Sequence, residues 1–234
     1  MAKMVGLSRN IKYRWLNKTV DFVKEGKTDQ EVKENLHDYL SFEIKSKDNL
    51  RKTREILLNI WLNSKYEYPS LHEKALRLLE KYPDDALAIH WCMMLLAYPV
   101  LSDLSVLLAN MSEYQEEITT AQLKQKMFDE WGERTTVFHS TDKIIMTLKD
   151  MEILSCDKPG RYKVIKHSIE SEDIVLFMIH TALNLKEGSY YSISDLGHIK
   201  LYFAFDYKID NTSIFEDDRL ILSNFGGKQT VSLK

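Results

Sequence analysis

Lysine and arginine side chains form two clusters in the first quarter of the chain, and their spacing suggests a definite chemistry. The first cationic cluster consists of Arg9, Lys12, Arg14 and Lys18. The second cationic cluster consists of Lys45, Lys47, Arg51, Lys52 and Arg54. Each holds more cations than the acids near it, whereas residues 67–117 are mainly acidic. Grouped cations neutralise phosphates, so the pattern favours a polyanionic partner. The alternative is a pair of solvated helix faces.

The sequence contains no recognisable motif for catalysis or metal binding. It has neither a Gly-rich phosphate loop nor a Gly-x-Ser-x-Gly elbow. None of its seven histidines is spaced i, i+4 from another, and none lies at a Cys/His metal-binding spacing. Cys92 and Cys156 lie in apolar stretches, which predicts two buried free thiols. We therefore expect no enzymatic activity, no cofactor and no metal.

Residues 117–166 must position the remaining candidate site residues, and they are predicted to form two helices and a hairpin. Thr119 and Gln122 have the spacing of a capping box at the start of the first helix. Apolar residues then recur at helical spacing as far as Trp131, and Gly132 ends the helix. This order is that of a winged helix-turn-helix.

The second of these helices is predicted to present a polar face to the major groove of DNA. Its apolar stripe consists of Val137, Ile144, Ile145, Leu148 and Met151. Its opposite face is expected to carry Thr136, His139, Ser140, Lys143 and Thr147. A helix that reads base edges needs hydrogen-bonding groups of this kind near its N-terminus. Helix-helix-hairpin modules also dock other proteins, so that alternative stays open.

The hairpin after this helix is predicted to hold the DNA backbone. Residues 153–156 suggest a short strand, and residues 157–160 are turn formers. Residues 161–166 alternate cationic and apolar side chains, as a strand with one solvated face does. Arg161 and Lys163 are its candidate phosphate contacts.

The chain is predicted to be mainly α-helical, in three parts. Residues 1–112 form an N-terminal helical bundle, with helices over 11–24, 29–40, 49–63, 69–82, 85–98 and 99–110. Residues 113–168 form the winged helix-turn-helix. Residues 169–234 form a long helix followed by a small winged-helix-like or hairpin unit, with a helix over 194–205 and a hairpin turning at Gly226-Gly227. The aromatic residues of 190–207 are expected in the core rather than stacked on bases.

Composition indicates an ordinary globular protein that has no overall charge bias. The chain has 234 residues, 44% of them hydrophobic and 29% charged, with a net charge of −3. Nucleic-acid binding must therefore come from local patches. No secretory signal is recognisable at the N-terminus. The apolar run 86–109 contains Pro99 and Asp103, so we expect two buried helices, not a membrane span, and a cytoplasmic location.

Three segments carry a resemblance to a known family. They are Lys47-Asp-Asn-Leu-Arg-Lys-Thr-Arg-Glu-Ile-Leu, Ala97-Tyr-Pro-Val-Leu-Ser-Asp-Leu and Leu148-Lys-Asp-Met-Glu-Ile-Leu. In these segments, and in order over residues 8–233, the chain resembles BrxA, the small accessory protein of BREX bacteriophage-exclusion systems. The resemblance implies a mostly helical protein with an N-terminal bundle similar to the antitermination factor NusB. It also implies double-stranded DNA binding, no known catalytic activity, and work beside a methyltransferase and other BREX components.

The sequence thus predicts a non-enzymatic DNA-binding accessory protein that contacts mainly phosphates. Its expected contact residues are Arg9, Lys12, Arg14, Lys18, Lys47, Arg51, Lys52, Arg54, Thr136, His139, Ser140, Lys143, Arg161 and Lys163. Two alternatives stay open: a protein-protein scaffold without DNA contact, and an RNA-binding protein. The oligomeric state and any preferred DNA sequence are not predicted.

Overall fold

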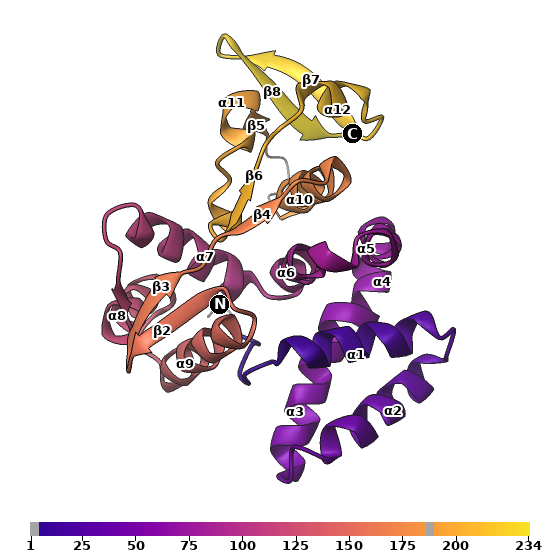
Figure 1. Ribbon diagram of the computed structural model, residues 1–234, viewed down its shortest axis with the longest axis vertical. Coiled ribbons are helices and arrows are strands. Elements are labelled where there is room, and N and C mark those ends of the chain that lie inside the picture. The colour runs from indigo at the N-terminus through magenta and orange to yellow at the C-terminus, as the bar shows by residue number, and fades with distance from the viewer. Residues whose placement is uncertain (1–4, 186–189) are drawn as a thin grey trace.

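The computed structural model describes residues 5–185 and 190–234, and it is mainly helical with three small sheets. Residues 1–4 lie outside the described residues, and residues 5–12, which precede α1, are called the N-terminal arm. The N-terminal helices are α1 (Tyr13–Lys24), α2 (Asp29–Ser41), α3 (Lys47–Leu58), η1 (Asn59–Asn63), α4 (Ser64–Glu67), α5 (Pro69–Lys81), η2 (Pro83–Asp85), α6 (Ala86–Ala97) and α7 (Pro99–Ser112). Figure 1 shows α1, α2 and α3 packed together beneath α5 and α6.

Several helices begin where their capping residues or first-turn prolines predict. The Thr28 hydroxyl accepts a hydrogen bond from the Glu31 amide over 3.3 Å, and the Glu31 carboxylate accepts one from the Thr28 amide over 2.8 Å. These two bonds form the capping box that begins α2. Pro99 occupies the first turn of α7, where its missing N–H costs nothing. The predicted pair of buried helices meeting at Pro99 is confirmed by α6 and α7.

The predicted single helix over 49–63 is interrupted in the structure. It ends as an α-helix at Leu58 and continues for one wider turn, the π-helix η1. Where the hydrogen-bonding pattern changes, the carbonyl of Ile56 accepts a hydrogen bond from the Tyr98 hydroxyl over 3.4 Å. A π turn is an α-helical turn that carries an extra residue, and it occurs often at functional sites.

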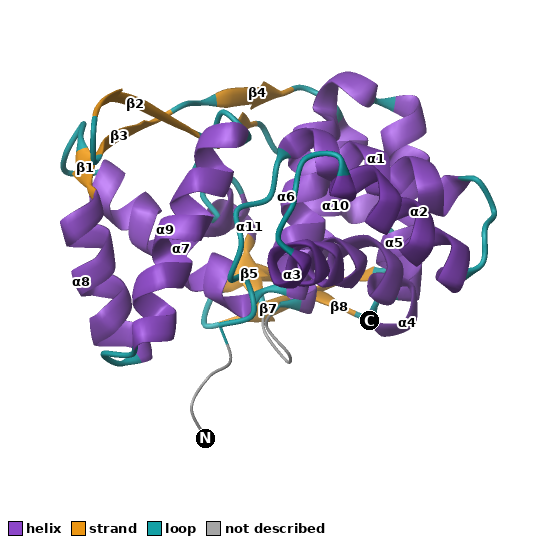
Figure 2. Cartoon of the chain, turned by 90° about the horizontal axis from the view of Figure 1, so that it is seen from below, coloured by secondary structure: helices purple, strands orange, loops and turns teal. Residues whose placement is uncertain are grey.

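The middle of the chain forms a compact unit in the order α7, strand, two helices and hairpin. Its further elements are β1 (Ile118–Thr119), α8 (Thr120–Trp131), α9 (Thr135–Asp150), β2 (Leu154–Lys158) and β3 (Arg161–Val164). Thr119 and Gln122 form the predicted capping box, and Gly132 ends α8 with φ +82°. The three strands are antiparallel in the order β1-β3-β2. Figure 2 shows this unit at the opposite end of the molecule from α1 and α2.

The last part of the chain, the C-terminal unit, has a similar order of elements with some additions. It contains β4 (His167–Ile169), α10 (Glu172–Asn184), β5 (Tyr191–Ser192), α11 (Ile193–Leu196), η3 (Lys200–Tyr202), β6 (Phe205–Tyr207), α12 (Asn211–Glu216), β7 (Leu220–Phe225) and β8 (Lys228–Leu233). Of these elements, β4, η3 and β6 are added to that order. Its sheet has the order β5-β8-β7, which matches β1-β3-β2. The predicted hairpin at Gly226-Gly227 is confirmed by β7 and β8.

The predicted helix over 194–205 is wrong. The segment divides into the short helix α11, the 3-10 turn η3 and strand β6. The cause is a long-range contact: β6 pairs in parallel with β4, with His167 opposite Phe205. Tertiary pairing of this kind overrides a local helical pattern. The aromatic side chains of Tyr202, Phe203 and Phe205 are buried, as the core interpretation predicts, but Tyr190 is 47% exposed and does not fit it.

Candidate nucleic-acid interface

The N-terminal arm is fastened to the end of α9. The backbone N–H of Ile11 donates to Oγ1 of Thr147 over 2.8 Å, and the backbone N–H of Tyr13 donates to Oδ1 of Asp150 over 2.7 Å. Thr147 and Ile11 are fully buried. The first cationic cluster therefore lies beside the C-terminal turn of the predicted recognition helix.

The Glu43 carboxylate contacts two members of the first cationic cluster, Lys12 and Arg14. Its carboxylate accepts hydrogen bonds from Lys12 over 2.8 Å, from Arg14, and from Nε1 of Trp15 over 3.1 Å. Partial burial opposes the ionisation of Glu43, but the hydrogen bonds from Lys12 and Trp15 outweigh it and lower the pKa of that carboxyl. The carboxylate is thus ionised at neutral pH and partly neutralises the two cations beside it.

Asp48 joins the two cationic clusters to each other. Its carboxylate lies 3.5 Å from Arg9, 3.2 Å from Arg51 and 2.8 Å from Lys52. The hydrogen bond from Lys52 is the main cause that lowers the pKa of Asp48. Because Arg9 belongs to the arm and the other two cations to α3, the clusters that are separate in sequence form one surface in the fold. We call this surface the arm–α3 face.

The remaining predicted cations of the N-terminal region differ in their surroundings. Lys18 lies 3.5 Å from Asp21. Arg54 lies 2.6 Å from Glu55 and 3.2 Å from Nδ1 of His37, so it is held away from open solvent. Lys47 is exposed, and within the part of the chain that the structure describes it has no ion pair. Lys47 is therefore less neutralised by acids than Arg9, Arg51 and Lys52 of the arm–α3 face.

The predicted recognition face of α9 is only partly exposed. Thr136 and His139 are exposed, and Lys143 is half-buried. The expectation for Ser140 and Thr147 is wrong, because Ser140 is 3% exposed and Thr147 is fully buried. Ser140 lies three residues after Val137 and four before Ile144, so its side chain falls within the apolar stripe. Thr147 is covered by the N-terminal arm.

The N-terminus of α9 has no side-chain cap. Arg134 occupies the capping position without such a hydrogen bond, and the first turn contains no acid. The amide groups of a first turn are therefore open to an external acceptor, and the helix dipole favours an anion there. Phe138, one turn further along, is 40% exposed and lies 3.5 Å beneath the Lys124 ammonium group.

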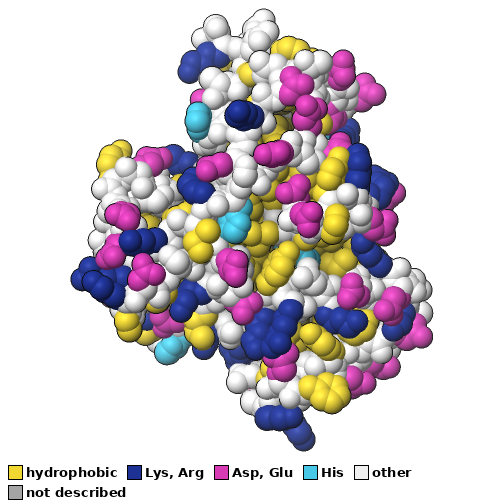
Figure 3. Space-filling view, in the orientation of Figure 1, with side chains coloured by type: hydrophobic (Ala, Val, Ile, Leu, Met, Phe, Trp, Pro, Cys, Tyr) yellow, Lys and Arg dark blue, Asp and Glu magenta, His cyan; other side chains and the backbone are white. Residues whose placement is uncertain are grey.

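The cations of the β2–β3 hairpin are paired with acids that precede α8. Arg161 lies 3.0 Å from Glu117, and Lys163 lies 3.0 Å from Glu116. Arg161 remains 56% exposed. Exposed ion pairs of this kind contribute about 0–1 kcal/mol, so a phosphate group is able to displace the carboxylates. On the face visible in Figure 3, basic and acidic side chains are interspersed.

A groove of about 890 Å³, which sequence reasoning missed, runs along the arm–α3 face. Arg51 and Lys52 line one side of it, and Asn59 and Asn63 of the π turn continue that side. Tyr98 and Trp131 belong to the other lining residues. The amide side chains add donors and acceptors beside the two cations. No local motif marks Asn59 and Asn63, since the groove exists only where α3, α7 and α8 meet.

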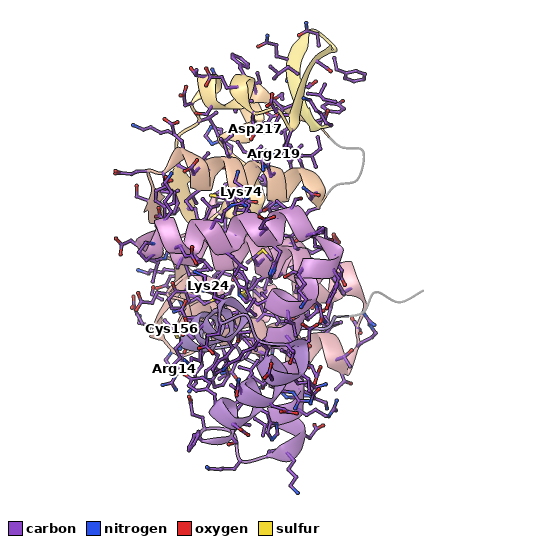
Figure 4. The ribbon with its side chains drawn as sticks, turned by 90° about the vertical axis from the view of Figure 1, so that its right-hand side faces the viewer. Arg14, Lys24, Lys74, Cys156, Asp217 and Arg219 are labelled. Carbon is purple, nitrogen blue, oxygen red and sulfur yellow. The ribbon has the colours of Figure 1, made fainter. Side chains whose placement is uncertain are left out.

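A cluster of charged groups lies where the last part of the chain faces Lys74 of α5. Asp217 accepts hydrogen bonds from Arg219 over 2.8 and 3.1 Å, and its carboxylate lies 3.0 Å from Nε2 of His180. Burial opposes ionisation of Asp217, but the Arg219 bonds outweigh it and hold its pKa at about 2. Burial, with the Arg219 charge, lowers the pKa of Lys74 to about 8. Figure 4 shows Lys74, Asp217 and Arg219 stacked in this cluster. We assign it a structural role.

Comparison with known proteins found no match among family models, curated proteins or solved structures. Within the described residues, no group of three or more His, Cys, Asp or Glu side chains is arranged to hold a metal ion. Nor is any single helix there long and apolar enough to cross a bilayer; the consecutive pair Pro83–Ala97 and Pro99–Ser112 has the length and composition together but bends by 119°.

Proposed function

We propose that this protein binds double-stranded DNA without catalysing a reaction on it. In this proposal the unit from α7 to β3 is a winged helix-turn-helix, α9 is its recognition helix and β2–β3 is its wing. The order of elements and the β1-β3-β2 sheet support that interpretation. The resemblance to BrxA supports a further proposal, that the protein works in a BREX bacteriophage-exclusion system beside a methyltransferase and its associated components.

The observation that carries the proposal is the attachment of the N-terminal arm to α9. The bonds from Ile11 to Thr147 and from Tyr13 to Asp150 bring the arm–α3 face next to the proposed recognition helix. Phosphates along one duplex would then meet two groups of cations separated by a helix with an uncapped N-terminus. Most contacts would be to phosphates, so affinity would depend more on salt than on sequence.

The test is duplex binding at two salt concentrations. Fluorescence anisotropy with a labelled random duplex of about 20 base pairs should show affinity falling roughly 100-fold between 50 and 200 mM KCl if about four phosphates are contacted. The Arg51→Glu/Lys52→Glu variant should bind at least tenfold more weakly. The matched control is Arg77→Glu/Lys208→Glu, which changes the charge equally at exposed positions outside the arm–α3 face. Salt-independent binding, or equal loss in both variants, contradicts the proposal.

A protein-protein scaffold is the second candidate, and the ion pairing favours it. The carboxylates of Glu43, Asp48, Glu116 and Glu117 already pair with cations of the proposed interface. This pairing reduces the local positive field. A scaffold would retain its partners from cell extract while showing no anisotropy change with duplex DNA. Competition with single-stranded RNA in the same assay separates RNA binding from both.

A further inference from the structure

The β7–β8 hairpin projects from the C-terminal unit with its tip in solvent. Residues 221–229 are all exposed, and the strands are joined by the two-residue turn Gly226-Gly227, in which both glycines have positive φ. Figure 1 shows the hairpin standing at the end of the molecule farthest from α3. The ring of Phe225 lies 5.2 Å from that of Tyr190, which supports the tip from one side. The β7–β8 hairpin is thus a regular element that extends outward from the hydrophobic core.

Among the residues that the structure describes, β7 is an edge strand without the charges or proline that usually protect such an edge. In the sheet order β5-β8-β7 it has a neighbour on one side only. Its sequence, Leu-Ile-Leu-Ser-Asn-Phe, contains no charge and no proline. Edge strands in natural proteins usually carry such residues, because bare edges pair with other strands. Ile221, Leu222 and Phe225 are 39%, 42% and 63% exposed, so the edge is apolar as well as open.

The hairpin register fixes which backbone groups of β7 are free. Phe225 lies opposite Lys228 across the two-residue turn, and this closing pair exchanges both of its hydrogen bonds. Hydrogen-bonded pairs alternate along an antiparallel ladder, so Ser223 and Ile221 also point their backbone groups toward β8. Leu222 and Asn224 therefore point their N–H and C=O groups away from the sheet.

We infer that β7 pairs with β7 of a second copy of this chain, antiparallel and centred on Ser223. In that register Leu222 exchanges hydrogen bonds with Asn224 of the second copy. Across the twofold axis, Asn224 likewise exchanges hydrogen bonds with Leu222 of the second copy. Ile221 then faces Phe225 of the second copy at a pair whose side chains are close. The four outward backbone groups named above are all satisfied, and the two sheets become one of six strands.

The charges at the base and at the tip of the hairpin favour antiparallel pairing with a second copy. The chain just before β7 is acidic on balance, with Glu216, Asp217 and Asp218 against Arg219, whereas Lys228 stands at the tip. Antiparallel pairing places the acidic base of each hairpin alongside the cationic tip of the other. Parallel pairing would place like charges together, which is unfavourable across neighbouring strands. The inference goes beyond the proposed function and holds whether or not the protein binds DNA.

The first experiment measures the mass of the full chain in solution. Sedimentation velocity over 1–100 µM should show concentration-dependent conversion of the 27.5 kDa chain to a dimer of about 55 kDa. Two double variants then test the register. Ile221→Lys/Phe225→Lys should be monomeric, because lysines would face lysines. Ile221→Glu/Phe225→Lys carries as many new charges but places Glu opposite Lys twice, so it should remain dimeric.

A cysteine at the proposed twofold axis gives a second readout that does not depend on affinity. In a Cys156→Ser background, Ser223→Cys should form an intermolecular disulfide under mild oxidation, because the two copies of residue 223 face each other. Ser232→Cys, on β8, should not. Far-ultraviolet circular dichroism shows that each variant is folded. A monomeric wild type at 100 µM, or a dimeric Lys/Lys variant, overturns the inference; so does a monomer whose β7 instead pairs with a strand of a different protein.

Discussion

Ile11 and Thr147 are joined by a buried hydrogen bond although they lie 136 positions apart in the chain, the Ile11 amide donating to the Thr147 hydroxyl over 2.8 Å. The same hydroxyl donates to the carbonyl of Lys143 over 3.0 Å, so one side chain satisfies a group on each of two segments. This contact holds the arm against α9 and thereby sets where the arm–α3 face lies.

Replacing Thr147 should therefore destabilise the fold. Thr147→Val keeps the shape but leaves the buried Ile11 amide without an acceptor, which should cost about 1–3 kcal/mol of unfolding free energy. Urea denaturation measures the change. Thr135→Val is the control, since Thr135 is exposed on the same helix, and it should change the free energy by less than about 0.5 kcal/mol. Thr147→Ser should restore most of the loss; equal effects of all three variants would show that the bond does not matter.

Removing an acid from the arm–α3 face should strengthen DNA binding if the proposed function holds. Glu43→Gln frees Lys12 and Arg14 for phosphate and removes a repulsive charge. Exposed charge interactions of this size predict an affinity gain of about two- to fivefold at 50 mM KCl. Glu34→Gln makes the same charge change on the exposed surface of α2 and should have little effect. An unchanged or weaker affinity for Glu43→Gln would remove this face from the interface.

Stability should fall as the pH drops from 6.5 toward 4. Burial lowers the pKa of His90 to about 3, and burial, with the Lys74 charge, lowers that of His180 to about 4. Both are near 6.5 in the unfolded chain, so in this window the unfolded state binds more protons than the folded one. The stability that the two neutral histidines contribute is therefore fully present above pH 6.5. It is lost at about 1.4 kcal/mol per pH unit for each histidine as the pH decreases below that value.

Denaturant titrations at pH 7.0, 6.0 and 5.0 test this dependence. His90→Gln should flatten the curve by the contribution of one histidine, whereas His198→Gln, at an exposed position, should leave its slope unchanged. Asp217, whose pKa is about 2, adds a loss only below pH 4, because its depressed pKa stabilises the fold wherever the carboxyl stays ionised. A level profile between pH 6.5 and 5 would show that neither histidine is desolvated.

Gly6 and Gly26 allow a close approach to be separated from backbone strain. Both have nearly the same positive φ, +70° and +69°. A Cβ on Gly6 would lie 3.0 Å from two ring atoms of Tyr98, whereas one on Gly26 would meet nothing within 4 Å. Gly26→Ala should cost about 1–2 kcal/mol for the backbone alone. Gly6→Ala should cost about 1–3 kcal/mol more for overpacking. Equal melting temperatures of the two variants would refute the contact.

Short-range features of this fold were predictable from the sequence. The capping boxes at Thr28 and Thr119, the end of α8 at Gly132 and the Gly226-Gly227 hairpin all depend on residues within four positions of each other. A local pattern determines such features because the interacting groups are close in the chain. The mainly helical class followed from them.

The candidate site was less predictable, because its determinants are distant in sequence. Asp48 attracts Arg9 from 39 positions away, and Glu116 lies 47 positions from Lys163. Charge counts along the chain identified the cations but not their partners. Ser140 was misplaced because a hydroxyl at the edge of an apolar stripe fits either face of a helix. Nothing in the sequence of either strand indicates the β4–β6 pairing. This pairing prevents residues 194–205 from forming one helix.

The π turn at Asn59–Asn63 sets the direction in which the start of α3 points. The wide turn is an α-helical turn with one extra residue, so it absorbs that residue with little change in the phase of the helix on either side. If all five residues closed into α geometry instead, the first half of the helix would rotate by about 100°, the turn of one residue. Arg51 and Lys52 would then leave the groove although the sequence stayed the same, whereas deletion of one residue within the turn would keep this charged surface where it is.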